Sequence, residues 1–218
     1  MAEPLQLFKG KIFLIGFNKC GTTSLHSFFE RNAIPSAHWG HNQLATQIYR
    51  NKHLNQPLLT GIDQYTAYSD MEAVIGQGSH PRLLLFAHRE FKLLDQHYGN
   101  SLFILNTRDQ NEWIRSRLKH ANGAYAQVYL QKLRIMARNP AITMEQMVKY
   151  WKREWIHHHH ETSLHFKDCN RFLTFHIHSD PPSLLSSFLL GHGVPIKDPT
   201  IPHDRAIGKI VSSKKAHP

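Results

Sequence analysis

The sequence predicts an α/β fold of three layers, in which a mostly parallel central sheet is covered by helices on both faces. Two apolar runs, residues 11–16 and 101–107, are each followed by a polar loop and a helical pattern, and residues 172–177 alternate as in a strand. Strands that alternate with helices favour parallel pairing, because a parallel neighbour is reached through a crossover connection. At 218 residues, we expect one domain that spans residues 1–218.

The first strand is expected at residues 11–16, a continuous apolar run that ends in glycine, as in a strand buried on both faces. A helix is expected at residues 23–32, because Leu25, Phe28 and Phe29 recur at helical spacing. The chain therefore opens with a strand, a loop and a helix.

The middle of the chain has less regular patterns. A short strand is predicted at 34–39, a helix at 41–51 and a second short extended segment at 58–63. The signals for these elements are therefore weaker than those in the two units that this region joins.

The second unit begins with a strand at 101–107, which leads to Arg108 and a helix that runs to Leu118. Asp109 and Glu112 have the spacing of a capping box at the start of that helix. Further on, helices are expected at 125–136, 144–159 and 179–190, and a strand at 172–177.

The charge balance favours anionic partners. Lys and Arg outnumber Asp and Glu by 26 to 16, and 18 histidines add positive charge at low pH. The two cysteines are too few for a disulfide scaffold, so we expect reduced thiols. Residues 12–17 are far fewer than the ~20 that a membrane span needs, so no span and a cytoplasmic location are expected. A basic tail from about residue 203 is expected to be flexible.

The loop between the first strand and the first helix has the composition of a phosphate cradle. Backbone N–H groups at a helix start are unsatisfied and lie at the positive end of the helix dipole. Glycine allows close approach, and the lysine and hydroxyl side chains add donors. The candidate ligand-binding residues are Asn18, Lys19, Cys20, Gly21, Thr22, Thr23 and Ser24.

This loop differs from the nucleotide-binding loop of NTPases, in which a lysine follows the second glycine. Thr22 occupies that place here, and the lysine lies two residues before Gly21. Residues 19–25 (KCGTTSL) therefore resemble the 5′-phosphosulfate loop of sulfotransferases that use 3′-phosphoadenosine 5′-phosphosulfate (PAPS). In ILNTRDQNEWIRSR, Arg108 and Ser116 are similarly placed to the residues with which that family holds the 3′-phosphate.

The resemblance implies a P-loop-like sulfotransferase core that binds PAPS and releases adenosine 3′,5′-bisphosphate. It implies in-line transfer of the sulfuryl group to a hydroxyl or amine of a small-molecule or carbohydrate acceptor, with no metal. Lys19 would stabilise the leaving oxygen, and Thr22 and Thr23 would bind the 5′-phosphate. The chain departs from many family members at Leu25, where they have tryptophan, which leaves the adenine contact open.

A hydroxyl acceptor needs a general base, for which the family uses histidine or glutamate. His38, which follows the predicted second strand, is the first candidate here. Asp63 and Asp70 come next, and His88 is the last candidate.

Two other functions fit parts of the sequence. A small-molecule or nucleotide kinase with ATP and Mg²⁺ would use a similar cradle, with Asp63 or Asp109 as the metal carboxylate. A non-catalytic nucleic-acid-binding protein would explain the formal charge of +10, but the basic residues are scattered and form no stripe, so nucleic acid is not expected. For Arg108 alone, a salt bridge to Asp109 or Glu112 is the simple structural alternative.

Overall fold

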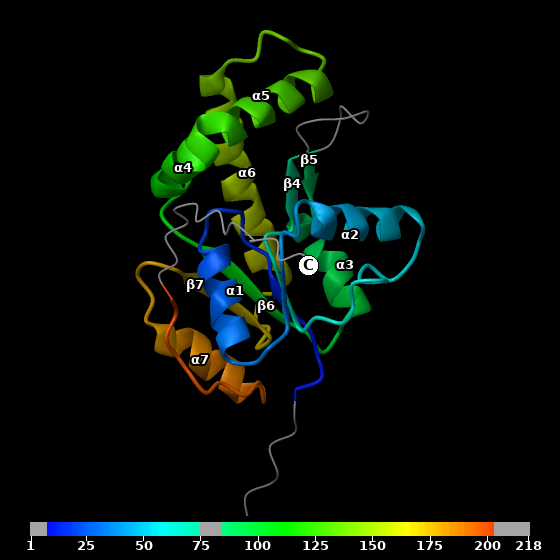
Figure 1. Cartoon of the computed structure of the whole chain (residues 1–218), viewed down its shortest axis with the longest axis vertical. Helices are drawn as coiled ribbons and strands as arrows, with labels where there is room; N and C mark the ends of the chain where they lie inside the picture. Colours follow the sequence, from blue (N-terminus) through cyan, green and yellow to red (C-terminus); the bar gives the residue numbers. More distant parts are fainter. Residues whose placement is uncertain (1–7, 75–83, 203–218) are drawn as a thin grey trace, which may run out of the picture.

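The computed structural model describes residues 8–74 and 84–202, and a five-stranded parallel sheet lies at its centre (Figure 1). The strand order is β2-β3-β1-β6-β7. The strands are β1 (Ile12–Leu14), β2 (Ser36–His38), β3 (Ala67–Ser69), β6 (Leu102–Thr107) and β7 (Phe172–His176). In register, Phe13 of β1 lies opposite Phe103 of β6 and Tyr68 of β3. Because all five strands are parallel, the loops that follow β1, β3 and β6 lie at the same edge of the sheet, its carboxyl edge.

Helices cover both faces of the sheet, because the side chains of β1 alternate between two apolar cores. Ile12 and Leu14 pack against α1 (Thr22–Arg31) and α7 (Pro182–Gly191). Phe13 packs with the core of the opposite face, which is covered by α2 (Gln43–His53), α3 (Phe91–His97) and the end of α6 (Met144–His165). The predicted three-layer α/β fold is confirmed.

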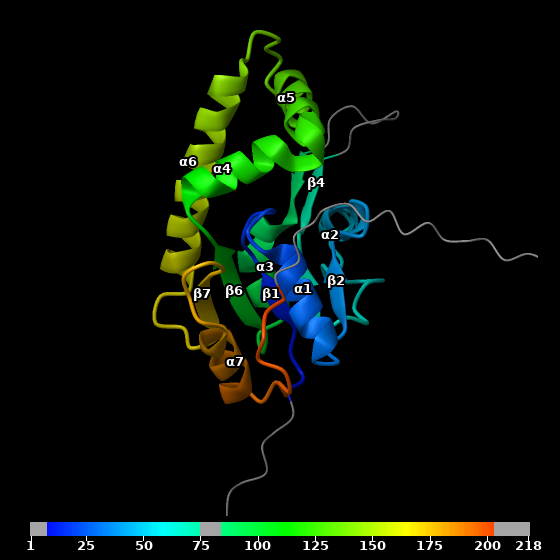
Figure 2. The same ribbon diagram turned by 60° about the vertical axis from the view of Figure 1, so that its left-hand side comes forward.

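A second group of elements extends beyond the carboxyl edge of the sheet (Figure 2). It contains the antiparallel hairpin of β4 (Glu72–Val74) and β5 (Leu84–Phe86), with α4 (Gln110–Lys119), α5 (Ala124–Met136) and most of α6. A third core, which includes Trp113, Trp151 and Trp155, holds these elements together. Short 3₁₀ turns, η1 (Ala87–Glu90) and η2 (His120–Gly123), join them to their neighbours. We call α4, η2, α5, α6 and the hairpin the cap.

Most predicted elements are confirmed with boundaries shifted by a few residues, but the extended segment predicted at 58–63 is wrong. That stretch forms turns, in which Leu58 and Leu59 are buried against the core. The strand lies at Ala67–Ser69 instead, and its three residues form no apolar run that would reveal it. The hairpin and α3 were not predicted, and α6 continues to His165.

The capping box predicted at the start of α4 is present in half: Asp109 accepts a hydrogen bond from the Glu112 backbone N–H, while the Glu112 side chain pairs with Arg108 and His178. Thr143 and Gln146 form a complete capping box on α6. Cys20 and Cys169 form no disulfide. None of the helices in the described residues has the length and apolar character to cross a membrane. The predicted basic tail lies outside the described residues.

Candidate active site

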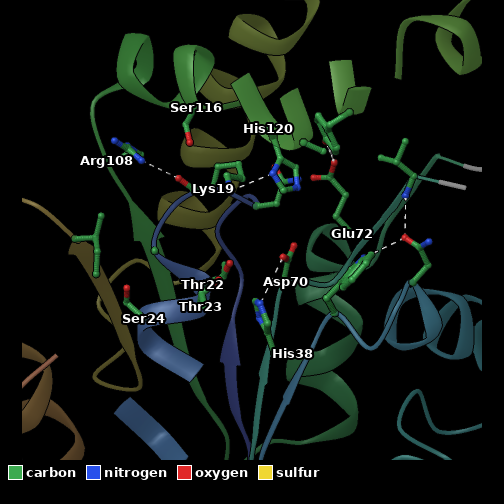
Figure 3. Close-up of a pocket in the computed structure, with 18 of the residues that line it drawn as sticks. Lys19, Thr22, Thr23, Ser24, His38, Asp70, Glu72, Arg108, Ser116 and His120 are labelled. Atoms are coloured by element: carbon green, nitrogen blue, oxygen red, sulfur yellow. Dashed lines mark hydrogen bonds and ion pairs between the residues drawn. The ribbon is translucent and has the colours of Figure 1, made fainter. Parts of the chain in front are cut away.

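A cavity of about 1040 Å³ lies between the carboxyl edge of the sheet and the cap (Figure 3). Its walls come from the β1–α1 loop, the ends of β2, β3, β6 and β7, the hairpin, α4 and η2. The lining residues are Asn18, Lys19, Gly21, Thr22, Thr23, Ser24, His38, Trp39, Asn42, Asp70, Glu72, Val74, Arg108, Ser116, His120, Ala121, Tyr125, Ile177 and His178. The structure thus gathers two sequence motifs that lie almost 90 residues apart into one cavity.

The start of α1 is shaped to receive an anion. Gly21 precedes the helix in the left-handed conformation, with φ of 76°, and no side chain caps the helix start. A Cβ atom on Gly21 would lie 2.5 Å from the Ile177 side chain, so only glycine fits. The first turn also contains no acidic residue. Its N–H groups and the hydroxyls of Thr22, Thr23 and Ser24 therefore offer donors to a bound phosphate or sulfate.

The buried side chain of Asn106 fixes the loop that precedes α1. Its Oδ1 accepts from the Gly16 N–H at 3.0 Å, and its Nδ2 donates to the Cys20 carbonyl at 3.0 Å. Trp113 Nε1 donates to the Asn18 carbonyl at 3.0 Å. Asn106 was not among the predicted residues, although a lone amide in the apolar run at 101–107 was a signal for a polar role inside the sheet.

The Lys19 side chain lies in the cavity wall beside η2. Its Nζ lies 3.4 Å from His120 Nδ1, and burial lowers the pKa of the Lys19 ammonium, opposed by the Asp70 charge. Its backbone has a φ of 64°, in the left-handed region. Lys19 therefore places a cation in the same cavity as the start of α1.

Arg108 and Ser116 line the same side of the cavity (Figure 3). One Arg108 amino group donates to the Lys19 carbonyl at 3.1 Å, and the other donates to Glu112 at 3.0 Å. The Arg108 Nε is buried and has no partner among the described residues. The predicted salt bridge to Glu112 is therefore present, and Arg108 still retains donor capacity beside Ser116.

Three of the predicted residues lie outside the cavity lining. The Cys20 side chain is fully buried in the cap core, so the residue has only its backbone to offer a ligand. Asp63 lies beside Lys11, whose Nζ donates to the Asp63 carbonyl at the opposite end of β1. His88 is fully buried and its ring packs against Phe17 and His158. Asp63 and His88 therefore do not reach the cavity, and neither is placed to serve as the general base.

His38 and Asp70 are the base candidates that line the cavity. His38 Nε2 lies 3.9 Å from an Asp70 carboxylate oxygen, and His38 Nδ1 lies 3.0 Å from Ser69 Oγ. Burial, with the charges of His26 and Lys19, lowers the pKa of His38 to about 4. Burial and the neighbouring Glu72 raise the pKa of Asp70 to about 7. Both groups are thus available as proton acceptors near neutral pH.

His120 and Glu72 are lining residues that the sequence motifs did not single out. Burial and the charges of Lys19 and Arg117 lower the pKa of His120, so its ring is neutral at neutral pH. Glu72 pairs with the buried Arg117 at 2.6 Å. Among the residues that the structure describes, no cluster of three His, Cys, Asp or Glu side chains is arranged to hold a metal ion.

The family model of the sulfotransferase domain matches residues 11–179 of this sequence. The match extends from β1 to the residues after β7, and includes the loop at the start of α1, Arg108, Ser116 and both base candidates. No curated protein matches the sequence. With a family match that covers most of the chain and both sequence motifs in the lining of one cavity, this protein belongs to the sulfotransferase domain family.

Proposed function

We propose that this protein transfers the sulfuryl group of PAPS to a hydroxyl or amine acceptor and releases adenosine 3′,5′-bisphosphate. The observation that carries the proposal is the meeting of Lys19, Thr22 and Thr23 with Arg108 and Ser116 in the lining of one cavity. These residues offer donors to two separate anionic groups, as a nucleotide with phosphates at its 3′ and 5′ positions requires.

In the proposed binding mode, the start of α1 holds the 5′-phosphosulfate. The uncapped N–H groups and the hydroxyls of Thr22 and Thr23 donate to its oxygens. Arg108 and Ser116 hold the 3′-phosphate, which competes with Glu112 for the guanidinium. PAPS supplies a sulfuryl group on a good leaving group, and the protein supplies position and charge.

The acceptor oxygen or nitrogen attacks sulfur, a new bond to sulfur forms, and the bond from sulfur to the 5′-phosphate oxygen breaks. Lys19 stabilises the negative charge that grows on that leaving oxygen. Asp70 takes the proton that the acceptor loses, and His38 lies beside it as the alternative base. The products are a sulfated acceptor and adenosine 3′,5′-bisphosphate, so charge and atoms balance.

A kinase is the second candidate because the cradle at the start of α1 also suits a nucleoside triphosphate. The two carboxylates that the sequence suggested as Mg²⁺ ligands, those of Asp63 and Asp109, do not line the cavity. Asp109 caps α4 by accepting from the Glu112 N–H at 2.9 Å, and Asp63 lies outside the cavity lining. This geometry favours sulfuryl transfer.

Calorimetric titration tests the proposal directly. The purified protein is titrated with adenosine 3′,5′-bisphosphate and, separately, with ATP and Mg²⁺, both at moderate salt. We expect tight bisphosphate binding without metal and weak binding of ATP. The reverse order would move the chain to the kinases, whereas steep salt-dependent binding of DNA or RNA alone would indicate a nucleic-acid-binding protein.

A further inference from the structure

The cavity has one side that is rich in donors and another that is rich in acceptors. Figure 3 shows Arg108, Ser116 and Ser24 on one side, and His38, Asp70 and Glu72 on the other. We call the second side the acceptor wall and define it by His38, Trp39, Asn42, Asp70, Glu72 and Tyr125. Its charged members are both acids, although the chain as a whole has a formal charge of +10. This contrast points to a ligand that brings donors to the wall.

Glu72 is held rigidly in the acceptor wall. Its Oε1 accepts from Arg117 at 2.6 Å and from the Tyr125 hydroxyl. Arg117 itself is 1% exposed, and the rings of Trp113, Tyr125, Tyr129 and Trp151 lie within 5.2 Å of its guanidinium carbon. Because these rings enclose Arg117, its guanidinium keeps the Glu72 carboxylate in one position in the cavity wall.

The second carboxylate oxygen of Glu72 is the unusual atom. Oε2 is buried and has no hydrogen-bond partner among the described residues, while the Glu72 side chain is 2% exposed. Buried carboxylate oxygens are normally hydrogen-bonded, because an unpaired one loses its hydration without compensation. Glu72 lines the cavity, and its carboxylate is directed from β4 toward α4 and α5, where Arg117 and Tyr125 lie (Figure 3). A donor on a bound molecule would satisfy this oxygen.

Asp70 adds a second carboxylate close by. Only Met71 separates the pair along the chain, so their Cα atoms are at most about 7 Å apart, and Met71 is buried in the core. Their mutual repulsion contributes to the raised pKa of Asp70. A neutral hydroxyl would satisfy Glu72 Oε2 but leave this repulsion unchanged. A cation would relieve it and keep Asp70 ionised, which is the state that a general base needs.

We infer that the acceptor is an amino alcohol whose ammonium group donates to Glu72 Oε2, while its hydroxyl, the group that is sulfated, lies at Asp70 and His38. This inference rests on the proposed function. Trp39, whose side chain is partly exposed and lines the cavity, offers an aromatic surface to the carbon skeleton and the ammonium of such a molecule. Anionic acceptors are disfavoured on the same wall by both carboxylates.

Three rigid probes on one carbon ring test the inference: trans-4-aminocyclohexanol, cyclohexane-1,4-diol and 4-hydroxycyclohexane-1-carboxylate. Each is titrated into the protein saturated with adenosine 3′,5′-bisphosphate. We expect the amine to bind at least about tenfold more tightly than the diol, because a hydrogen bond between two charged groups is the stronger one. The carboxylate should bind most weakly of the three.

The variant Glu72→Gln should reduce the preference for the amine over the diol to less than about threefold. Glu161→Gln is the matched control, because it removes the same charge from a residue paired with Lys92 outside the cavity lining. It should keep the full preference. Since the readout is a ratio of two affinities, a general loss of stability in Glu72→Gln does not imitate the expected result.

Wild-type protein that binds the amine no more tightly than the diol, or binds neither, overturns the inference even where Glu72→Gln fails to fold. An unchanged preference in Glu72→Gln overturns it as well. Failure of the bisphosphate to bind in the first place is a different result, because it contradicts the proposed sulfotransferase function instead of the acceptor class.

Discussion

At the scale of the single residue, His38 and Asp70 show how one cavity moves two pKa values in opposite directions. Burial disfavours the charged form of each group. It therefore lowers the pKa of His38 to about 4 and raises that of Asp70 to about 7. Near neutral pH, His38 is neutral and Asp70 exists in both forms, so the two candidate bases differ in the pH at which they become active.

If Asp70 is the base, kcat/KM should rise with pH and level off above about 7, because the ionised carboxylate is the reactive form. Asp70→Asn should lower kcat by roughly 10²- to 10⁴-fold and abolish this rise. His38→Asn should retain it. Steady-state kinetics between pH 5 and 9 measure the profile. A rise that persists in Asp70→Asn would assign the base elsewhere, with His38 the next candidate.

Truncation of Lys19 should mainly lower kcat, whereas truncation of Arg108 should mainly weaken bisphosphate binding. Lys19→Ala should lower kcat by roughly 10²- to 10³-fold while bisphosphate binding is partly retained, because its charge acts on the leaving oxygen. Arg108→Ala should weaken bisphosphate binding by roughly ten- to a hundredfold, since it removes charge-assisted hydrogen bonds to the 3′-phosphate. Calorimetry and turnover assays with PAPS separate the two effects.

The control for this pair is Arg115→Ala, because Arg115 is exposed on the same helix as Ser116 and does not line the cavity. It should leave both measurements near the wild-type values. Unchanged affinity for adenosine 3′,5′-bisphosphate in Arg108→Ala would show that the 3′-phosphate site has been assigned wrongly.

At the scale of the secondary-structure element, the pair of Arg117 and Glu72 connects α4 to β4 across the cap. Both side chains are buried, at 1% and 2% exposure. Removing one member of a buried ion pair leaves the other charge without compensation, and this costs about 3 to 5 kcal/mol. The hairpin therefore depends on a residue of α4 for its position.

Arg117→Leu should reduce the free energy of unfolding by about 3 to 5 kcal/mol, measured by urea denaturation. The double variant Glu72→Leu, Arg117→Leu should recover much of that loss, because replacing both members with apolar residues removes the isolated charge. If the single and double variants were equally destabilised, the loss would come from the aromatic packing around Arg117 and the ion pair would have little part in it.

The elements that the sequence predicted well are those with local signals. The strand β6 has six buried residues and opens with an apolar run of four, and the starts of α4 and α6 have capping residues. The loop at the start of α1 and the pair of Arg108 and Ser116 were found from short motifs for the same reason. Each of these motifs consists of residues that are close together in the sequence, so it can be recognised without knowing the fold.

The acceptor wall was predicted poorly because its signals are not local. Asp63 and Asp70 were equal candidates until the position of β3 showed that Asp70 follows the strand end and Asp63 lies beside Lys11. Glu72 is in a three-residue strand, and its partner Arg117 lies 45 positions further on. No pattern in a single sequence pairs two charges at such a separation.

At the scale of the whole molecule, two buried histidines connect the cap to the sheet and its first loop. His158 of α6 donates from Nε2 to the Ile15 carbonyl at 2.6 Å, and its ring packs against those of Phe17 and His88. Burial lowers the pKa of His158 to about 3 and that of His88 in the same direction. Both rings are therefore neutral in the folded protein under ordinary conditions.

The folded protein should lose stability as the pH falls below about 6.5. In that range the unfolded chain binds a proton at His158 and the folded chain does not, so each pH unit costs up to about 1.4 kcal/mol until the pH approaches the folded-state pKa of about 3. His158→Gln, which keeps a donor for the Ile15 carbonyl, should flatten this slope. Urea denaturation at several pH values measures it.

The exposed His160, two residues along the same helix, provides the control. His160→Gln should leave the slope unchanged, because its side chain is exposed on the surface of the helix. A slope that remained just as steep in His158→Gln would show that acid sensitivity comes from other groups.

The division of the cavity between two sets of elements has a consequence for how this protein could change through evolution. The groups proposed to bind PAPS are supplied by the β1–α1 loop and α4 with its preceding loop, whereas much of the acceptor wall comes from β2, β3 and the hairpin. Mutations in the second set can alter the acceptor without touching the first. Acceptor choice and PAPS binding can therefore diverge separately, and a library restricted to residues 39–42 and 72–74, which keeps His38 and Asp70, is the place to redirect this enzyme to new acceptors.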